Sequence, residues 1–472
     1  MTDKATVGKT AYDPATFRLP TWSERLEAFR AGDDRPSDCL ARCLSTIAER
    51  EPVVQAWVTL NEPGAMAAAE DSDRRWKTGS PLSPIDGMPV GVKDLYMTRD
   101  MPTQMGSPLY AGRTTGEDSA CVQALRLAGA VILGKTVTTE LGFSHPGPTT
   151  NPFDAARTPG GSSSGSAAAV GAGMVPAALG SQVVGSVIRP AGFCANTAIK
   201  PTLGALHRGE RQGLSHSHLG VHAAGIEDMW AVTHAIARLS GGDPGSPGLY
   251  GPEAAPGAMA PRSLIVVESE GWEQTDDATL AAFERLLEAV AAAGVTLIRR
   301  QGRADLEAFE REIAESLLLC RDICGWELRW TLRNLARKDI TMLSPSMRVR
   351  LELAEAMSID DYRAALAKRE AMRARFRAVA ATADAMITLS STGPAPFMEG
   401  NSGKGEPGIT HTTGLPAFNA WTSAIGCPAV TVPMLAVEGM PVGVQIVGRH
   451  DEDWRTTGIA RWLKETVAPV AG

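Results

Sequence analysis

Two glycine-rich segments that carry serines constrain this chain most strongly, because each requires a turn between elements built from apolar residues. The first reads Pro-Gly-Gly-Ser-Ser-Ser-Gly-Ser over residues 159–166, and the second reads Gly-Ser-Gln-Val-Val-Gly-Ser over residues 180–186. Glycine has no Cβ, so backbone N–H groups in such loops can turn toward a bound atom. An Ala-rich stretch (166–173) and an apolar stretch (175–179) separate the two segments. The pattern predicts a loop, a small-residue helix, a strand and a second loop.

The same alternation of apolar strands and helices extends along the chain. Residues 88–92 are apolar and end at Lys93, residues 117–129 have helical periodicity, and residues 130–134 are apolar again. This rhythm predicts parallel strands with covering helices. Further strands are expected at 263–267, 295–298, 385–389, 429–433 and 442–447, and helices at 276–293, 305–337, 344–380 and 451–466. The expected fold is α/β, with a mixed, largely parallel twisted sheet covered by helices on both faces.

We expect one domain over residues 1–472, with four regions. A Gly- and Pro-rich stretch at 241–261 marks the main internal boundary. The regions are an N-terminal helical region (20–80), a catalytic core (84–240), a helical region that could form a lid (262–380) and a C-terminal return to the core sheet (381–470).

Composition excludes several classes of function. With 46 basic and 53 acidic residues the net charge is −7, which argues against a nucleic-acid surface. No apolar run reaches the roughly 18 residues needed to span a bilayer. The first residues, MTDKATVGKTAYDP, lack an apolar signal core, so we expect a cytoplasmic protein without a membrane partner. A homodimer is left open.

The cysteine and histidine pattern favours structural roles. Seven scattered cysteines do not form a disulfide framework. Cys39 with Cys43 and Cys320 with Cys324 have helical i,i+4 spacing, but no histidine stands at zinc-ligand spacing, so buried thiols are expected. His216 and His218 are interpreted as solvent-exposed, in a polar loop. We predict no metal and no cofactor.

The serine loops and Lys93 suggest acyl transfer. If residues 183–186 turn tightly before a helix, their N–H groups converge beside Ser186 as an oxyanion hole. Lysine at the end of an apolar strand is unusual, and burial would lower its pKa, so that the neutral amine of Lys93 could take a proton. Ser162 could bridge Lys93 and Ser186. The simpler alternative is that both loops are flexible linkers and Lys93 reaches the surface.

Two further patterns match motifs of other enzymes. Gly129-x-x-x-x-Gly134-Lys135-Thr136 fits a P-loop, but the intervening Ala-Val-Ile-Leu favours a buried strand. Gly-Ser-Ser-Ser-Gly at 161–165 fits a nucleophile elbow, which would make Ser163 the nucleophile with His411 or His450 as its base. The polar, Pro-rich stretch at 148–159 lacks the strand that an elbow requires.

These segments together resemble the amidase signature family of serine hydrolases, closely over about 84–202 and again over 385–465. The matching motifs are Gly-Val-Lys-Asp at 91–94, Ala-Gly-Ala-Val-Ile-Leu-Gly-Lys-Thr at 128–136, Asn-Pro at 151–152, Gly-Gly-Ser-Ser at 160–163, Gly-Ser at 185–186, Ala-Gly-Phe-Cys at 191–194, Pro-Ala-Val at 428–430, Pro-Val-Gly at 441–443 and Gln445. The resemblance implies a Ser–cis-Ser–Lys triad on a mixed sheet covered by helices.

Carried over by motif, the resemblance assigns roles to residues of this chain. Ser186 would be the nucleophile, Ser162 the bridging serine on a cis peptide, and Lys93 the base that later protonates the leaving amine. The expected oxyanion donors are the N–H groups of Val183, Val184, Gly185 and Ser186. The expected loop supports are Gly161, Ser163 and Gln182.

Some residues depart from the family pattern. Gln182 stands where Asp is common, Val184 and Ser164 stand where Gly or another small residue is common, and Ile-Arg at 188–189 replaces the usual order. A sub-branch of the family shares the Gln and the Val-Ile-Arg-Pro order, so we do not infer a loss of activity. Gln182 is expected to change the charge near Lys93 or the loop, and Val184 to crowd the acyl pocket.

The predicted function is hydrolysis of a non-peptidic amide through an acyl-enzyme. An aryl or medium acyl amide is the expected small-molecule substrate, with ester, hydrazide or carbamate (urethane) cleavage as further activities. The alternative is the amidase subunit of a glutamine-dependent amidotransferase. Candidate pocket residues are Met105, Phe143, Trp326, Trp330, Phe397 and Trp421.

Overall fold

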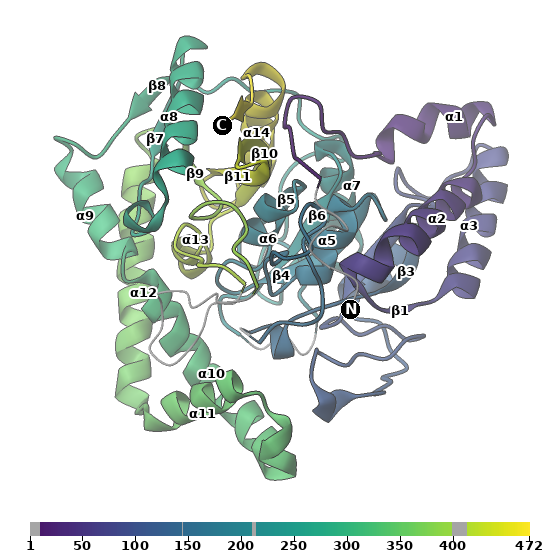
Figure 1. Ribbon diagram of the computed structural model, residues 1–472, viewed down its shortest axis with the longest axis horizontal. Helices are drawn as coiled ribbons and strands as arrows, with labels where there is room; N and C mark the ends of the chain where they lie inside the picture. The colour runs from purple at the N-terminus through teal and green to yellow at the C-terminus, as the bar shows by residue number, and fades with distance from the viewer. Residues whose placement is uncertain (1–9, 144, 210–213, 399–412) are drawn as a thin grey trace.

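A twelve-stranded sheet forms the centre of the protein, described by a computed structural model that covers residues 10–143, 145–209, 214–398 and 413–472 (Figure 1). In sheet order the strands are β1 (Trp57–Leu60), β3 (Val131–Thr136), β2 (Pro89–Lys93), β4 (Ala177–Gln182), β6 (His218–Ala223), β5 (Thr197–Lys200), β10 (Ala429–Val437), β11 (Met440–Val447), β9 (Ala385–Leu389), β7 (Ser263–Val266) and β8 (Thr296–Ile298). The short β12 (Val470–Ala471) pairs with β10.

The sheet is mixed, as predicted, but parallel pairing does not dominate it. Parallel pairs join β2 to β3 and β4 toward one end, and β7 to β8 and β9 at the other. Between them, the strands from β4 to β9 pair antiparallel throughout. The parallel pairing that the sequence rhythm predicted holds for the β–helix–β units at the two ends. The centre contains β5 and β6, which the pattern did not predict, and the β10–β11 hairpin.

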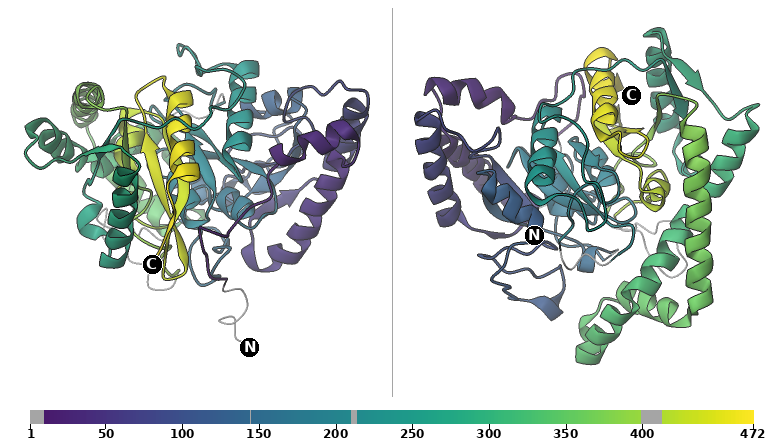
Figure 2. Two further views of the ribbon diagram at one scale, coloured as in Figure 1. Left: turned by 90° about the horizontal axis from the view of Figure 1, so that it is seen from above. Right: turned by 180° about the vertical axis from the view of Figure 1, so that it is seen from behind.

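Helices cover both faces of the sheet and both of its ends. On one face lie α4 (Ala120–Leu127), α7 (Ile226–Ser240), α8 (Asp277–Ala292) and α14 (Asp453–Thr466). On the other lie α5 (Ser164–Gly171), α6 (Ile188–Phe193) and α13 (Ala420–Ile425). The β1 end carries α1 (Leu26–Ala31), α2 (Pro36–Val54) and α3 (Glu62–Lys77), and Figures 1 and 2 show these helices far from those formed by residues 304–380.

Alternating side chains fix which face each helix covers. In β7, Leu264 and Val266 are buried in the cluster beneath α8, whereas Ile265 is buried in the cluster that holds α13 and helices of residues 304–380. This period of two is the expected consequence of the strand pleat. Because both faces are apolar, the strands read as nearly continuous hydrophobic runs and not as alternating ones.

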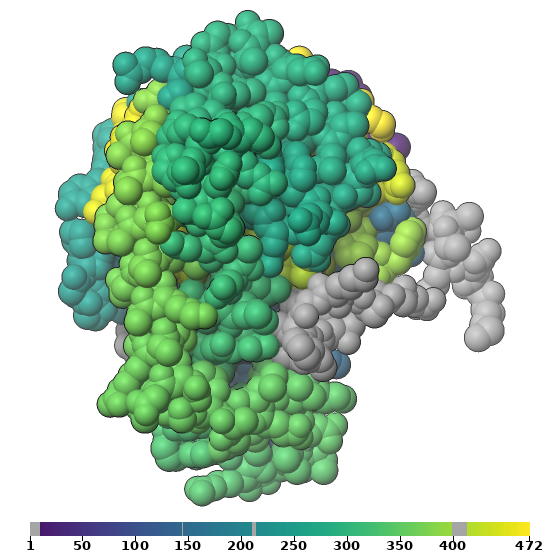
Figure 3. Space-filling view, turned by 90° about the vertical axis from the view of Figure 1, so that its left-hand side faces the viewer, coloured from purple at the N-terminus to yellow at the C-terminus, as the bar shows by residue number. Residues whose placement is uncertain are grey.

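Residues 304–380 form a helical layer over one end of the molecule (Figure 3). Its helices are α9 (Ala304–Ile313), α10 (Ser316–Asp339), α11 (Pro345–Ala356) and α12 (Ile359–Ala380). The far end of the α10–α11 pair is docked, since Leu332, Leu335 and Met347 pack with Leu141 and Phe143 of the core. Whether this layer opens as a lid stays a prediction.

The N-terminal region is helical only in part. Residues 57–60 form β1, which pairs antiparallel with β3, inside a stretch that was predicted to be helical throughout. Among the described residues no helix is both long and apolar enough to cross a bilayer.

Candidate active site

Lys93 lies at the carboxyl end of β2 with its amine surrounded by serine hydroxyls. The side chain is fully buried. Its Nζ lies 2.7 Å from Ser162 Oγ, 3.0 Å from Ser163 Oγ and 2.9 Å from Ser181 Oγ. Ser181 comes from β4, which pairs in parallel with β2 and ends at the same edge of the sheet. The alternative in which Lys93 reaches the surface is therefore wrong.

The acidic neighbour of Lys93 is engaged elsewhere. Asp94 forms a buried ion pair with Lys135, with 2.9 Å between Oδ1 and Nζ, and accepts a hydrogen bond from the backbone N–H of Gln104. Within the described ranges Lys93 itself makes no ion pair. Burial lowers the pKa of the Lys93 amine well below its ordinary value, because no carboxylate offsets the desolvation of the charged form.

Ser162 is held by a constrained loop. The Gly161–Ser162 peptide bond is cis, as the resemblance implied. Arg189 clamps this loop, because its Nη2 donates to the Gly161 carbonyl at 2.7 Å and its Nε donates to the Thr413 carbonyl at 2.9 Å. The guanidinium is buried, which lowers the pKa of Arg189 to about 9. Helix α5 begins directly after this loop and carries the chain away from the site.

Gln182 anchors the second loop through both ends of its side-chain amide. Its Oε1 accepts from the N–H groups of Val187 at 2.8 Å and Ile188 at 3.0 Å. Its Nε2 donates to Ser423 Oγ at 3.0 Å, and that hydroxyl donates to the Val184 carbonyl at 2.8 Å. Gln182 was expected to act either near Lys93 or at the loop, and its side-chain contacts are with the loop and its anchor. A neutral amide serves here because the site needs an acceptor and a donor together.

A pocket brings Ser162 and Ser186 together at the protein surface. Gly185 shapes it, since a Cβ there would lie 2.7 Å from Arg189 Nη1 and 2.8 Å from Asn419 Oδ1. Besides the two serines, the pocket is lined by Gly142, Phe143, Gly161, Val183, Val184, Gly185, Arg189, Leu317, Arg350, Thr413 and Pro416. Both serines and all four residues from 183 to 186 therefore line the same pocket.

Comparison with known proteins identifies the family of this chain. The family model Amidase matches residues 38–456. The chain belongs to the amidase family. It is 38% identical over 225 residues to the A subunit of glutamyl-tRNA(Gln) amidotransferase from Chloroflexus aggregans, a match that spans 46% of each chain, about half the length of that relative. It is 30% identical to fatty acid amide hydrolase from Arabidopsis thaliana, over 97% of this chain and 78% of the relative.

A solved amidase structure shares the fold. It superposes with a TM-score of 0.82 at 26% identity, covering 95% of this chain and all of that one. The family relationship and the fold implied by the sequence motifs are thus confirmed.

In this member of the amidase family, Phe143 is the one predicted pocket residue that lines the described part of the pocket. Met105 lies close behind it. Its backbone N–H donates to the Asp94 carbonyl at 3.0 Å, and its carbonyl accepts from the N–H of Leu141 at 2.8 Å. Met105 therefore positions the turn that carries Phe143.

The other aromatic candidates lie outside the pocket. Trp421 is fully buried against Phe309, with ring centroids 5.8 Å apart. Trp326 stacks on Tyr362, and Trp330 is 62% exposed on the outer side of α10. Phe397 is half exposed beneath the guanidinium of Arg157. Sequence periodicity predicts that a residue lies on a helix. It does not predict which side of that helix faces the pocket, because that depends on tertiary packing.

The prediction for the two histidines was wrong. Both are buried: His218 begins β6, which inserts between β4 and β5 in the middle of the sheet, and His216 packs against α10. His218 Nδ1 lies 3.3 Å from the Gln182 carbonyl, and His216 Nε2 lies 3.4 Å from Cys324 Sγ. Burial lowers the pKa of His216 to about 3, so it is neutral.

The structure also resolves the competing motifs. Residues 131–136 of the P-loop match form β3, which is buried throughout, and Lys135 pairs with Asp94. Ser163 is fully buried and donates to the Ser181 carbonyl at 3.2 Å, so it does not face the pocket as an elbow nucleophile would. His450 contacts the Ile425 carbonyl. His411 lies outside the described residues.

Sequence reasoning missed three residues of the site: Ser181, Arg189 and Ser423. Ser181 directly precedes Gln182 in the second loop, but only the pairing of β2 with β4 shows that it reaches Lys93. Ser423 lies 241 residues beyond Gln182 and has no local signal. All seven cysteines are buried, as expected. No group of metal-binding side chains occurs in the described ranges.

Proposed function

We propose that this chain is a serine hydrolase that cleaves a non-peptidic amide bond through an acyl-enzyme on Ser186. The observation that carries the proposal is the buried Lys93 amine, bonded to Ser162 Oγ at 2.7 Å beneath a pocket that Ser162 shares with Ser186. A buried lysine surrounded only by neutral partners favours its uncharged form, which is the form that accepts a proton.

The hydrogen-bond inventory supports a direction for proton flow. A neutral amine has two N–H donors and one lone pair. Ser163 Oγ gives its own hydrogen to the Ser181 carbonyl, so toward Lys93 it acts as an acceptor. If the two amine hydrogens go to Ser163 and Ser181, the lone pair of Lys93 faces the Ser162 hydroxyl. Ser162 then donates to Lys93 and has lone pairs left to accept the proton of Ser186.

The reaction follows from this chain of donors. Ser186 Oγ attacks the carbonyl carbon while its proton moves to Ser162, whose own proton moves to Lys93. The N–H groups of residues 183–186 stabilise the oxyanion. The ammonium of Lys93 returns the proton through Ser162 to the amide nitrogen, the C–N bond breaks and the amine leaves. Water then attacks the ester on Ser186, activated by the same pair, and releases the carboxylate.

The anchoring of the second loop supports its role as an oxyanion hole. Preorganised donors stabilise a transition state because they need no rearrangement during the reaction. Gln182 and Ser423 fix this loop at both ends, through Val187 and Ile188 on one side and Val184 on the other. Because the loop recognises only a developing oxyanion, esters, hydrazides and carbamates are further substrates of the proposed site.

Covalent trapping tests the nucleophile directly. The protein is incubated with an activated aryl ester or a fluorophosphonate, digested, and the adduct located by mass spectrometry. We expect the adduct on Ser186, and none in Ser186→Ala. An adduct on Ser163 would support the nucleophile-elbow alternative and overturn the proposal. Turnover of an amide panel, with Ser186→Ala as the control, then defines the substrate class.

A second candidate function is the amidase subunit of a glutamine-dependent amidotransferase. Curated relatives of that description support it, including one from Rhodopirellula baltica that is 29% identical over 93% of this chain. Glutaminase activity measured with the purified chain, and again with the partner subunits of an amidotransferase added, distinguishes the two functions. Ammonia release from glutamine only in the presence of the partners would favour the second.

A further inference from the structure

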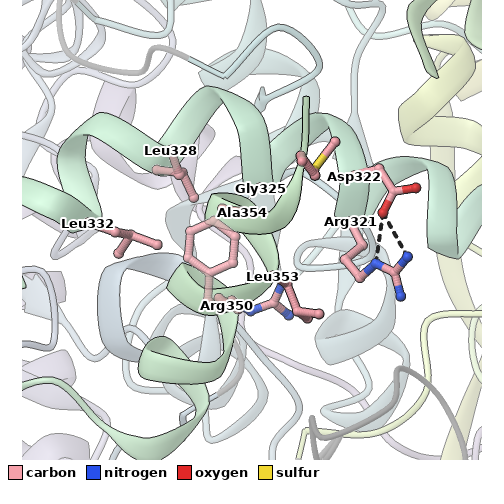
Figure 4. Close-up of a pocket in the computed structure, with 10 residues that line it drawn as sticks. Arg321, Asp322, Gly325, Leu328, Leu332, Arg350, Leu353 and Ala354 are labelled. Carbon is pink, nitrogen blue, oxygen red and sulfur yellow. Dashed lines mark hydrogen bonds and ion pairs between the residues drawn. The ribbon is translucent and has the colours of Figure 1, made fainter. Parts of the chain in front are cut away.

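A second pocket adjoins the reaction pocket and lies between α10 and α11. The two share Phe143 and Arg350, which line both of them. The second pocket has a volume of about 120 Å³, and Gly325 of α10 lines it (Figure 4). Leu328, Leu332, Leu353, Ala354 and Met357 make its walls mostly apolar.

The polar groups of this pocket lie at its ends. At the junction with the reaction pocket, the guanidinium of Arg350 lies 5.0 Å from the centre of the Phe143 ring. At the other end, Arg321 and Asp322 form an ion pair of 2.7 Å (Figure 4). An apolar cavity with few polar groups at its edges is the usual form of a small-molecule site.

Gly325 keeps this space open at a cost to α10. Glycine is unfavourable in a helix interior, and α10 contains no other glycine. Packing does not require it, because a Cβ at this position would lie 3.8 Å from both Ala354 Cβ and Met357 Sδ, which is ordinary contact. A larger side chain would extend into the pocket. The glycine therefore preserves volume that the fold itself does not need.

We propose that this pocket binds the apolar part of the substrate, a group about the size of one phenyl ring or an alkyl group of similar volume. An engineered apolar cavity of about 150 Å³ is known to hold benzene, and the present volume is slightly smaller. The inference rests on the proposed hydrolase activity, because the pocket adjoins the site that holds Ser186, with Phe143 and Arg350 lining both. It adds the size and polarity of the group that selects the substrate.

Three amides test the pocket: N-methylacetamide, N-methyl-2-phenylacetamide and acetanilide. Release of methylamine or aniline is followed by mass spectrometry. We expect kcat/KM to be at least about tenfold higher for one or both phenyl substrates than for N-methylacetamide, a common gain for filling an apolar pocket. A preference for N-methyl-2-phenylacetamide places the acyl group of the substrate in the pocket. A preference for acetanilide places the amine group there.

Substitutions at Gly325 link that preference to the pocket. Gly325→Leu should lower the ratio of phenyl to methyl kcat/KM by about tenfold, and the smaller Gly325→Ala by severalfold. Should the leucine variant fail to fold, the alanine variant carries the test. Asn334→Leu, which adds the same side chain at an exposed position of α10, should leave the ratio at the wild-type value.

The outcomes separate this inference from the proposed function. If wild-type protein hydrolyses amides in a manner that depends on Ser186 but shows no phenyl preference, or if Gly325→Leu leaves the preference intact, the pocket does not select the substrate. If no amide or ester is hydrolysed at all, the proposed function itself is overturned.

Discussion

Three lysines are fully buried in the part of the chain that the structure describes, and each is accommodated differently. Lys135 pairs with Asp94. Lys200 donates to the Cys427 carbonyl and has a pKa lowered to about 8. Lys93 has only hydroxyl and carbonyl partners, which do not repay the desolvation of a charge. Of the three, Lys93 is the one that contacts a serine of the reaction pocket. The lysine whose charged form has the least stabilisation therefore lies beside the pocket in which the proposed reaction needs a base.

The pH dependence of turnover should report this lowered pKa. The active form is the neutral amine, so kcat/KM is expected to rise with pH through the pKa of Lys93 and then level off. Because burial lowers that pKa, the rise should be complete well below the pKa of 10.5 of an ordinary lysine. Initial rates on a stable amide between pH 5 and 10 measure the profile. A rate that falls over this alkaline limb would contradict the role of Lys93 as base.

Replacing Lys93 should separate stability from catalysis. In Lys93→Met a buried amine is exchanged for an apolar side chain of similar length, so amide turnover should fall by at least about a thousandfold. The variant should still fold.

In the wild type, the free energy of unfolding should rise as pH increases toward 10.5, because Lys93 binds a proton in the unfolded chain that it does not bind in the folded protein. Urea denaturation of both proteins at several pH values measures whether this slope is smaller in the variant.

Gln182 should be needed for loop geometry and stability. In Gln182→Leu the N–H groups of Val187 and Ile188 lose their acceptor, and Ser423 loses a donor. A buried group left unsatisfied costs about 1–3 kcal/mol. We therefore expect a clear loss in the free energy of unfolding and at least a tenfold loss in kcat, with KM less affected. Wild-type kcat in this variant would show that the loop does not depend on Gln182.

At the scale of elements, local pattern predicted what is local. The strands ending at Lys93 and Gln182, and the small-residue helix between the serine loops, are present within a few residues of their predicted positions. β5 and β6 were not predicted. β6 pairs with β4 and β5, its neighbours along the chain, whereas β5 also pairs with a distant strand. Thr197–Lys200 is partnered by β10 more than 200 residues later. In the same way, Lys93, Ser162 and Ser186 were proposed from local sequence motifs. Ser423 and the walls of the pocket that come from distant segments were not predicted, because their positions depend on long-range packing.

The turn after β2 depends on one buried ion pair. Lys135 of β3 contacts Asp94, the Pro102 carbonyl and Thr103 Oγ1, while Asp94 accepts from the N–H of Gln104. Lys135→Met leaves a buried carboxylate without its cation and should destabilise the protein by about 3–5 kcal/mol. Adding Asp94→Asn should recover part of that loss, which urea denaturation measures.

A surface pair provides the control for this prediction. Arg30 pairs with Glu27 on an exposed side of α1, so Arg30→Met should cost no more than about 1 kcal/mol. Equal losses at the two positions would mean that the buried pair has no special structural role.

At the scale of the whole molecule, the site draws on distant parts of the chain. Lys93, Ser162 and Ser186 come from the first half, Leu317 and Arg350 come from the helical layer, and the loop anchors come from residues 413–423. The sheet is equally interwoven, because β5 pairs with β10 and α6 packs on β10 and β11. The catalytic core predicted at 84–240 therefore contains the three proposed catalytic residues but not all of the surfaces that hold them in place.

This interdependence predicts how the chain behaves when it is divided. Residues 241–261 lie in a connection between α7 and β7, where Tyr250 is half exposed. A fragment of residues 1–249 would leave β5 as an open edge and expose the apolar surface that β10 and β11 cover, so we expect it to aggregate without activity. Coexpression with residues 250–472 should restore a soluble pair with Ser186-dependent turnover. A full-length chain cut at an engineered protease site near residue 250 after folding should stay active, which separates the effect of the break from the loss of the second half. Soluble, active 1–249 alone would show instead that the first half is an independent domain.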